Sequence, residues 1–545
     1  MKRRSFIKKS IGAAAVPVFL NGLPLRAFAN EFTKLTAGSP NDHVVVMIQL
    51  MGGNDGLNTL IPLDQYDQYA ENRPFVAIPE EGNRKYILLN ETDPPEKQLG
   101  LHPDMSHFKQ MYDEKLVTIV QNVAYENPDM SHFRGRDIYF MGGGTNDYWH
   151  SGWMGRYLDG TYEGYPDEYP NDEMPDPLGL EFGYSMSLIY QREEGIPAGM
   201  AIIDPESFHQ LISGGGIDPP DWLPDSHFGD EMKYLMDLEL KANQYGDRIK
   251  EVYDAGINSP NVTYPETYPG EVEEGYKKND LAWQLQIIAR MLSGGSKTKT
   301  FLVKLNGFDS HAEQVLENDT TQGVHAALLY HLSSAIKAFY DDLKDQDLDT
   351  RVVTCTTSEF GRRVNDNASF GTDHGTAAPQ FLFGPMLKQQ LIGNPPDLSN
   401  LDDGNLIYEF DYRQIYTSIL FDWMETPLEI LDEVHWTDFV DSRLDLFHTP
   451  DGIDDGKGFA AVTEMSVYPN PATTNTNLKF TLKKAGHIHL AIYDLNGRIV
   501  RQLFEGNKVV GEHLISTSVQ GLKKGYYLVR LRSGYKITGK KLLVQ

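Results

Sequence analysis

Residues 351–384, RVVTCTTSEFGRRVNDNASFGTDHGTAAPQFLFG, carry the clearest structural signal in the chain. The run Val352–Thr356 is short, apolar and rich in β-branched residues, which predicts a buried strand of a parallel sheet. The strand ends abruptly in Ser358–Arg362 (SEFGR), and a polar loop leads to Gly371–Gly375 (GTDHG) and a second apolar run, Gln380–Phe383. Open α/β sheets bind their ligands just beyond strand ends. The stretch therefore predicts one wall of a metal-dependent active site.

Two further apolar runs predict strands of the same sheet. His43–Leu50 (HVVVMIQL) is almost continuously apolar, which predicts a central strand, and Asp55 follows its end. Asp55 is either a turn residue or a side chain that points off the strand end. Thr300–Leu305 (TFLVKL) predicts another buried strand, followed by Asp309 and His311. A carboxylate and an imidazole two residues apart can turn to one side of a loop, and such a pair suits Zn²⁺ or Mn²⁺.

The phrase Asp-Met-Ser-His-Phe occurs twice, at residues 104–108 and 129–133. The first copy is typical of helix capping. The second follows a predicted strand and opens the predicted helix SHFRGRDIYFMGG, so two roles are open for Ser131. Ser131 either caps the helix, or it is a nucleophile that a metal activates and whose developing charge meets the helix amides.

Polar residues of metal-ligand or nucleophile type follow several predicted strands, and a parallel sheet brings such ends together at one edge. These residues are Asp55, Ser131, Asp309, His311, Glu359 and His374. Asp373 is a further candidate ligand, with a turn residue as the alternative, and Glu359 could instead pair with Arg362 or Arg363. The set favours a divalent metal, with Zn or Mn ahead of Mg or Ca. Arg134 and Arg362 are candidate catalytic clamps for an oxyanion.

The charge of the chain is unevenly distributed. The formal net charge is −28. Residues 30–462 hold 73 acidic and 30 basic side chains, whereas residues 463–545 hold four acidic and 13 basic side chains. So acidic a body repels nucleic acid, and we expect no nucleic-acid partner. The single cysteine, Cys355, excludes a disulfide framework and a zinc site made of thiolates.

The N-terminus predicts an export signal over residues 1–29 rather than a folded element. Lys2–Lys8 (KRRSFIK) is a twin-arginine pattern, a mildly apolar run follows, and Ala27-Phe28-Ala29 is typical of a cleavage site. The alternative is an ordinary secretory signal with adjacent arginines. The apolar run is short and interrupted by Pro and Gly, so we expect no transmembrane segment.

Helical and irregular segments separate the predicted strands. Residues 324–343 predict a helix that joins two strands in a βαβ unit, which makes the core α/β. Residues from about 160 to 275 are rich in Tyr, Pro, Asp and Gly, and they predict an acidic insertion. A linker is predicted over residues 446–462.

The last 83 residues, 463–545, differ in character, with short alternating strands and a basic composition. They predict a small antiparallel β-sandwich. The phrases VYPNP, IYDLNGRIV, LKKGYYLVRL and KKLLV resemble the C-terminal sorting domain of type IX secretion substrates, which are found in Bacteroidota. The resemblance implies the type IX secretion machinery as a partner and a final location at the cell surface or outside the cell. A carbohydrate-binding or adhesive module is the alternative.

Several long motifs of the body also resemble one family. LMGGNDGLNTLIP, SHFRGRD, SGWMGRYLD, GFDSHAEQ, SEFGRRV, GTDHGTAAPQFLFG and DYRQIY are similar to the domain-of-unknown-function 1501 family, over about residues 42–425. That family is grouped with the alkaline phosphatase and sulfatase superfamily. The resemblance implies an alkaline-phosphatase-like α/β/α sandwich over residues 42–445, with metals at the carboxyl edge of a mainly parallel sheet.

The resemblance also assigns roles to individual residues. Asp55 would match the first-strand metal aspartate, Ser131 the nucleophile at a helix start, and Asp309 with His311 the aspartate–histidine pair on one metal. Glu359 stands where the superfamily has an Asp-His dipeptide, and His374 resembles a later metal histidine.

The sequence departs from the superfamily pattern in two respects. Phe360 stands in place of the histidine of the dipeptide, so a second metal position would lack an imidazole. Neither Cys355 nor Ser131 lies in a C/S-x-P-x-R motif, which disfavours formylglycine sulfatase chemistry. Two functions remain: a metal-dependent hydrolase of a small-molecule or glycan ester of phosphate or sulfate type, or a catalytically inactive relative that serves as a surface binding or structural protein.

Overall fold

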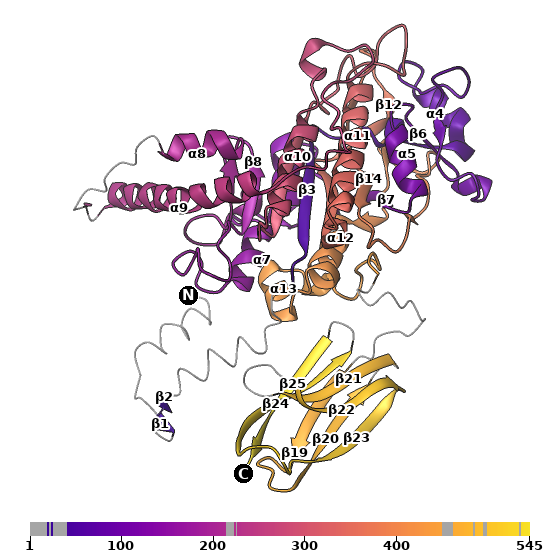
Figure 1. Ribbon diagram of the computed structural model, residues 1–545. Helices are drawn as coiled ribbons and strands as arrows, with labels where there is room; N and C mark the ends of the chain where they lie inside the picture. Colours follow the sequence, from indigo (N-terminus) through magenta and orange to yellow (C-terminus); the bar gives the residue numbers. More distant parts are fainter. Residues whose placement is uncertain are drawn as a thin grey trace. The chain divides into compact units, whose positions relative to one another are not determined.

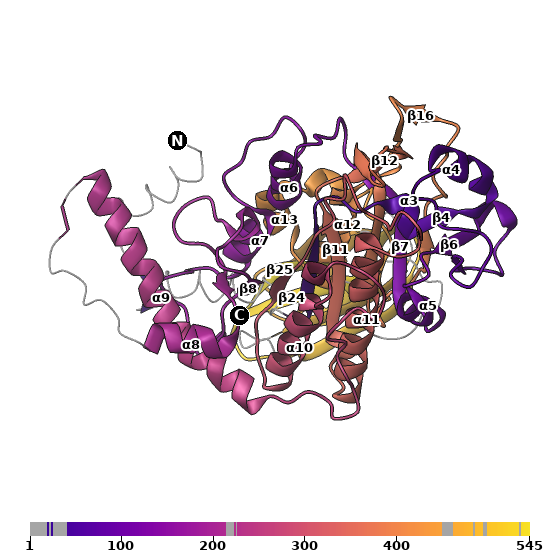
Figure 2. The same ribbon diagram turned by 90° about the horizontal axis from the view of Figure 1, so that it is seen from above.

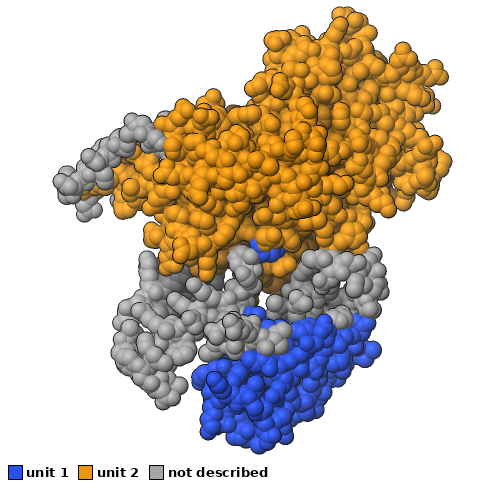
Figure 3. All heavy atoms as spheres, in the orientation of Figure 1, with its two compact units in different colours: residues 1–41, 449–545 blue, residues 42–448 orange. Residues whose placement is uncertain are grey.

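A computed structural model describes residues 19–20, 23–24, 41–213, 223–224, 226–448, 462–482, 486–493, 499–533 and 536–545. The chain forms two units, residues 42–448 and residues 1–41 with 449–545 (Figures 1 and 3). The predicted export signal lies outside the described residues, apart from the two-residue strands β1 (Phe19–Leu20) and β2 (Leu23–Pro24). Residues 449–461 of the predicted linker also lie outside them.

The larger unit is built on a nine-stranded sheet with the order β15-β7-β14-β11-β3-β10-β8-β9, and β18 also pairs with β7. All pairings in this sheet are parallel except the two made by β14. The strands are β3 (Val44–Met51), β7 (Val117–Ala124), β8 (Gly179–Phe182), β9 (Met200–Ile202), β10 (Thr300–Asn306), β11 (Val352–Ser358), β14 (Ala378–Phe383), β15 (Leu391–Ile392) and β18 (Phe410–Asp411). The prediction of a mainly parallel α/β sheet is confirmed.

Helices cover both faces of this sheet. Along the central strand β3, Val44 and Val46 belong to one buried core and Val45 and Met47 to the other, as the alternation of side chains along a strand requires. The first core also contains residues of α5, α9, α10 and α11, and the second contains residues of α6, α7, α12 and α13. Figure 2 shows α10 and α11 on one side and α6, α7 and α13 on the other. The unit is thus the predicted α/β/α sandwich.

The helices and the small sheets of this unit have the following bounds. The helices are α3 (Gly56–Thr59), α4 (Tyr66–Asn72), α5 (Ser106–Asp113), α6 (His132–Met141), α7 (Trp153–Thr161), α8 (Pro205–Ser213), α9 (His227–Ala255), α10 (Asp280–Ser293), α11 (Val324–Asp345), α12 (Tyr412–Ser418) and α13 (Leu428–Val434). Small sheets are formed by β4 (Leu60–Pro62), β6 (Leu99–Leu101) and β5 (Ile87–Leu88), by β12 (Gly361–Asp366) with β13 (Thr372–Gly375), and by β16 (Leu401–Asp402) with β17 (Asn405–Leu406).

The stretch predicted as an acidic insertion, about residues 160–275, is in part a component of the main sheet. It supplies β8 and β9, which extend the sheet beyond β10. Both strands are short, three or four residues, and they lie among Pro-rich loops, so their periodicity was too brief to identify them. The long helix α9 follows them, on the far side of the body from β12 (Figure 2).

The smaller unit contains two antiparallel sheets, β19-β20-β23 and β22-β21-β24-β25. Their strands are β19 (Val462–Tyr468), β20 (Asn475–Leu482), β21 (Gly486–Tyr493), β22 (Ile499–Lys508), β23 (Gly511–Ser518), β24 (Gly525–Ser533) and β25 (Lys536–Val544). One core joins the two sheets, because Leu478 and Phe480 of β20 belong to it together with Leu490 of β21 and Val529 of β24. This is the predicted small β-sandwich.

Among the helices of the described ranges, none combines the length and the apolar character that crossing a membrane requires.

Candidate metal centre

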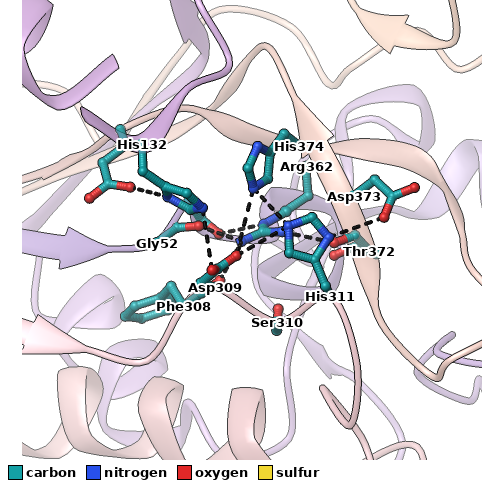
Figure 4. Close-up of polar contacts among 12 residues, drawn as sticks. Gly52, His132, Phe308, Asp309, Ser310, His311, Arg362, Thr372, Asp373 and His374 are labelled. Carbon is teal, nitrogen blue, oxygen red and sulfur yellow. Dashed lines mark hydrogen bonds and ion pairs between the residues drawn. The ribbon is translucent and has the colours of Figure 1, made fainter. Parts of the chain in front are cut away.

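Four side chains converge at the carboxyl edge of the main sheet (Figure 4). They are His132, Asp309, His311 and His374, and one ligand atom from each lies within 4.8 Å of the others. The Nε2 atoms of His132 and His311 lie 3.3 Å from the Asp309 carboxylate, and that of His374 lies 3.6 Å from it. We call these four residues the His₃Asp cluster. His132 begins α6 after β7, Asp309 and His311 follow β10, and His374 lies on β13.

The outer nitrogen of each imidazole is held by an oxygen atom. The contacts are His132 Nδ1 to Glu359 Oε2 at 2.6 Å, His311 Nδ1 to Asp373 Oδ1 at 3.2 Å, and His374 Nδ1 to the Met130 carbonyl at 2.7 Å. An ionised carboxylate or a carbonyl only accepts hydrogen bonds, so each Nδ1 carries the proton. Each Nε2 then faces Asp309. Metal-binding histidines are oriented by their outer nitrogen in the same way.

The donor set of the cluster fits a divalent cation. The Nε2 atoms of His311 and His374 lie only 2.8 Å apart, a distance that a hydrogen bond spans if one nitrogen carries a proton and that a shared cation spans if neither does. Burial lowers the pKa of His374, which keeps its imidazole neutral. Burial would raise the pKa of Asp309, but the hydrogen bond from Arg362 and the nearby His132 outweigh this effect and lower it. Three imidazoles and a carboxylate are ligands that Zn²⁺ and Mn²⁺ accept.

Arg362 ties together the loops that carry the cluster. Its side chain is fully buried, and its Nη2 donates to Asp309 at 3.0 Å. It also donates to the backbone carbonyls of Gly52, Gly53, Phe308 and Thr372. Arg362 is a candidate clamp for an oxyanion on the sequence alone, but these contacts make it a positioning residue for Asp309.

A glycine allows the loops after β3 and β10 to approach each other. Gly52 has a φ of +117°, and a Cβ atom there would lie 2.1 Å from the Asp309 backbone nitrogen. No other residue type fits both the backbone conformation and the space. The close approach brings the ends of the two strands together and fixes where the Asp309 side chain begins.

Three of the predicted metal ligands, Asp309, His311 and His374, lie in the cluster. Two others, Glu359 and Asp373, lie outside it and contact its histidines. Glu359 is buried and hydrogen-bonded to His132, and burial raises its pKa. Asp373 is exposed and accepts from His311 and Asn367, and these two hydrogen bonds lower its pKa. Both carboxylates therefore orient a histidine rather than extend to the centre of the cluster.

Asp55, the other predicted ligand, does not join the cluster. It is buried beside Arg73, with 2.7 Å between Nη1 and Oδ2, and both side chains are inaccessible to solvent. It also accepts from Gln314 and caps α3 through Asn58. Burial alone would raise the pKa of Asp55, but Arg73 and the other partners lower it. Both carboxylate oxygens of Asp55 therefore form hydrogen bonds inside the fold.

Arg134, the second predicted clamp, points to a neighbouring loop. Its guanidinium donates to the carbonyls of Thr145 and Asp147 and lies 3.9 Å from the centre of the Tyr148 ring. These acceptors lie 11 and 13 residues away in sequence, so no local pattern indicates them. Arg134 thus fixes the position of the loop that carries Tyr148.

Ser131 occupies the N-cap position of α6, yet its side chain makes no capping hydrogen bond. The residue is exposed, and its backbone nitrogen donates to Asp129. Its two neighbours both contact the cluster, since Met130 holds His374 through its carbonyl and His132 is a member. Ser131 therefore lies in sequence between two residues that contact the cluster, and its hydroxyl is not used for capping.

His132 is the member of the cluster that was not predicted from the sequence. Its signal was present, because His132 follows Ser131 in the second Asp-Met-Ser-His-Phe phrase, in the segment between a predicted strand and a predicted helix. In the first copy the corresponding histidine, His107, lies on α5 and packs against Tyr330. The phrase is the same in both copies, and only the position of β7 in the sheet distinguishes them.

Phe360 fills the space beside the cluster. Its ring is 3% exposed, and its centre lies 4.3 Å from that of His374 and 5.0 Å from that of His132. It stands where the family resemblance places a histidine, so the four cluster residues form one compact donor set rather than part of a larger one. Within the described part of the chain, this is the group of His, Cys, Asp and Glu side chains that meets the geometry of a metal site.

Residues 254–402 match the family described as Protein of unknown function (DUF1501). The matched segment carries Asp309, His311 and His374, and also Glu359 and Asp373 behind them. The resemblance inferred from the sequence motifs is thereby confirmed for this segment, whereas His132 lies outside it.

Residues 466–545 match the family described as Secretion system C-terminal sorting domain. This match confirms the second resemblance, which was inferred from the phrases of residues 463–545. The domain indicates export and a location at the cell surface or outside the cell, with the type IX secretion machinery as the partner that receives it. A search of curated protein sequences finds no match.

Solved structures with likeness to the chain are distant from it. A protein in the alkaline phosphatase superfamily from Vibrio parahaemolyticus has 10% identity and a TM-score of 0.28, with 93% of this chain and 84% of that chain covered. The alkaline phosphatase from the Antarctic bacterium TAB5 has 11% identity and a TM-score of 0.26, with 64% of this chain and 92% of that chain covered. The lipoteichoic acid synthase from Listeria monocytogenes has 8% identity and a TM-score of 0.30, with 90% of this chain and 92% of that chain covered. Likeness at this level carries no conclusion about activity.

Proposed function

We propose that the chain is an exported metal-dependent hydrolase of a phosphate- or sulfate-type ester, with its metal in the His₃Asp cluster. The observation that carries the proposal is the convergence of three imidazole Nε2 atoms on the Asp309 carboxylate. Each imidazole is held from behind by Glu359, Asp373 or the Met130 carbonyl. Such backing is typical of metal ligands and is not needed by histidines that only fill a core.

The ligand types favour Zn²⁺ or Mn²⁺ over Mg²⁺ or Ca²⁺, because the two hard cations prefer sites made only of oxygen atoms. His132, Asp309, His311 and His374 would hold the cation. A bound cation of this kind supplies Lewis acidity to an ester oxygen and lowers the pKa of a hydroxyl or water beside it.

Ser131 is the residue that we propose as the nucleophile. The residue is exposed, its hydroxyl is not used for capping, and in sequence it stands between two residues that contact the cluster. It also stands at the start of α6, where the free backbone N–H groups of the first turn favour negative charge. An oxyanion that forms on the ester would be stabilised there by the amides of α6.

Arg362 contributes to this reaction by holding Asp309 rather than by contacting the substrate. Its side chain is inaccessible to solvent, and its hydrogen bond restricts the carboxylate to one orientation. A ligand that is fixed in advance does not lose conformational freedom when the cation binds, which favours tight binding.

A second function is favoured by one observation, the packing of Phe360 against His132 and His374. An apolar ring at this place restricts the room for a second cation. If hydrolysis of the ester requires two cations, the chain would instead be a surface protein that binds ligands through its cluster without turning them over.

The first experiment is elemental analysis of protein purified without chelator, with and without added metal. We expect close to one Zn or Mn per chain in the wild type, and loss of that metal in the His132→Ala, His311→Ala and His374→Ala variants. His107→Ala is the matched control, because His107 occupies the same place in the other copy of the phrase but lies on α5. Absence of metal under both conditions would refute the proposal.

A screen of phosphate and sulfate esters then separates the two functions. In the hydrolase, Ser131→Ala abolishes turnover while the metal content stays at the wild-type level. Turnover that is unchanged in Ser131→Ala excludes this residue as the nucleophile. A metal-loaded protein that hydrolyses none of the esters is the binding protein.

A further inference from the structure

The buried side chain of Gln314 joins the two segments that carry His311 and His374. Its Oε1 accepts hydrogen bonds from the hydroxyl of Ser310 at 3.0 Å and from that of Thr372 at 2.8 Å. Ser310 directly precedes His311, and Thr372 lies two residues before His374 on β13. Both hydroxyl-bearing residues lie beside the cluster (Figure 4). One amide oxygen therefore links the segment after β10 to the strand of His374.

Asp55 determines which way the amide of Gln314 faces. The Nε2 atom of Gln314 donates to Asp55 Oδ2 at 2.6 Å, and this carboxylate is paired with the guanidinium of Arg73 at 2.7 Å. An ionised carboxylate only accepts hydrogen bonds, so the NH₂ end of the amide must face Asp55 and its oxygen must face the two hydroxyls. Asp55 therefore acts on the surroundings of the cluster although it does not belong to it.

Water cannot replace these hydrogen bonds. Gln314 and Thr372 are completely buried, and Ser310 is 4% exposed, so each polar group that loses its partner would stay unsatisfied. The backbone joins the same segments, because the Thr372 nitrogen donates to the Ser310 carbonyl at 3.0 Å and the Gln314 nitrogen to the Phe370 carbonyl at 2.9 Å. The side chain of Gln314 adds Asp55, which follows β3, to this arrangement. Three separate parts of the chain thus meet at one amide.

We propose that Gln314 is a positioning residue of the His₃Asp cluster, and that it holds His311 and His374 at the spacing that a shared cation needs. Asp373 and the Met130 carbonyl fix the rotation of the two rings, but the distance between the rings depends on how their segments lie. Ligands that are spaced in advance bind a cation without losing conformational freedom. The role of the cation rests on the proposed function, whereas the spacing of the two segments does not.

The test replaces Gln314 by methionine, which has a similar length but cannot form the three hydrogen bonds of the amide. We expect the affinity for Zn²⁺ and Mn²⁺, measured by competition with a chelator, to fall about tenfold, the smaller of the usual effects of losing an outer partner of a metal ligand. Gln284→Met is the matched control. Gln284 is also buried and forms two hydrogen bonds with the Lys304 backbone, but it lies on α10. This variant should bind the cations as the wild type does.

Hydrogen exchange of the metal-free protein tests the spacing without any cation. In Gln314→Met we expect faster exchange of the backbone amides in both segments, 309–314 and 370–375, and in Gln284→Met we expect wild-type exchange there. Thr372→Val is a milder variant that removes one of the hydroxyls, and it should act in the same direction, so it decides the question if Gln314→Met does not fold. Because both substitutions remove the same hydrogen bond, the double variant should lose less affinity than the two single losses combined.

Reduced cation affinity together with faster exchange in both segments supports the inference. Wild-type exchange in either segment overturns it, and so does wild-type affinity in a protein that binds the cation. An equal loss of affinity in Gln284→Met also overturns it, because the loss would then follow from lower stability alone. If the wild type binds no cation, the proposed function fails, and the exchange of the two segments alone decides whether Gln314 holds the histidines together.

Discussion

Each histidine of the His₃Asp cluster depends on the residue behind it. Glu359 illustrates the principle, because its buried carboxylate lies 2.6 Å from His132 Nδ1 and leaves Nε2 to face Asp309. A carboxylate behind a ligand makes the imidazole a stronger base and fixes its rotation. The sequence marked Glu359 as important but could not distinguish a ligand from the partner of a ligand, since both follow strand ends.

The Glu359→Gln substitution removes the charge and keeps the shape of the side chain. We expect the affinity for Zn²⁺ or Mn²⁺ to fall about 10- to 100-fold, the usual effect of losing an outer partner of a metal ligand. Competition with a chelator of known affinity measures the change. Glu313→Gln is the control, because Glu313 is exposed and lies two residues after His311. An affinity that is the same in both variants would show that Glu359 has no part in metal binding.

The buried pair of Asp55 and Arg73 makes stability depend on pH. The folded-state pKa of Asp55 lies below its unfolded value, because Arg73 and the other hydrogen-bond donors outweigh the effect of burial. A group of this kind binds fewer protons in the folded state, so its stabilisation is present above the unfolded pKa, about 3.9, and is lost as the pH falls through the folded value.

Asp55→Asn should lower the free energy of unfolding by about 3–5 kcal/mol at pH 7, because Arg73 remains buried without its counter-charge. The difference from the wild type should shrink as the pH falls below about 4. Denaturant unfolding of metal-free protein at a series of pH values measures both effects. Asp113→Asn, which removes an exposed pair with Lys109, should change stability by less than about 1 kcal/mol. A difference for Asp55→Asn that does not vary with pH would contradict this account.

Among the elements, α6 links the parts of the candidate site. It begins at His132, follows Ser131, carries Phe133 and Arg134, and approaches the end of β11 closely. A Cβ atom on Gly135 would lie 2.6 Å from the Glu359 carbonyl oxygen, so glycine sets the distance between helix and strand. The position of α6 thus determines how far His132 reaches toward Asp309.

Gly135→Ala should push α6 away from β11. We expect a loss of about 1–3 kcal/mol in stability, typical of an added methyl group in a packed site, together with weaker metal binding because His132 moves with the helix. Calorimetry and metal titration measure the two effects. Gly275→Ala is the control, since a Cβ atom there meets nothing within 4 Å. Wild-type metal affinity in Gly135→Ala would show that the helix position does not govern the cluster.

At the scale of the whole molecule, each unit has its own core and its own charge. The larger unit contains the cluster, two large buried cores and most of the 77 acidic residues. The smaller unit has a separate core, and the sorting match over 466–545 lies within it. The acidic unit and the sorting unit can therefore be tested one at a time.

A chain that ends at residue 448 should fold, keep the wild-type metal content and retain any esterase activity, because residues 42–448 contain complete cores. In cells, however, it should not reach the surface or the medium, since it lacks the sorting domain. Metal analysis of the purified truncation and immunoblots of cell fractions measure the two outcomes. Truncated protein at the surface would show that another segment directs export.

Local patterns in the sequence were sufficient to predict the architecture. Continuous apolar runs predicted β3, β10 and β11 because a parallel strand is buried on both faces, and the alternating phrases of the tail predicted its sandwich. The short strands β8 and β9 were not identified, because three or four residues carry too little periodicity.

The composition of the candidate site was decided by tertiary structure. The sequence alone predicted Asp309, His311 and His374, because each is a ligand-type residue at a strand end or in the hairpin after one. It could not assign Asp55 to Arg73, Arg134 to the loop of Tyr148, or Glu359 to His132, since each contact joins residues distant in the chain. Strand ends show which side chains gather at an edge, but the packing of α6 and the burial of Arg362 determine which of them face the same point.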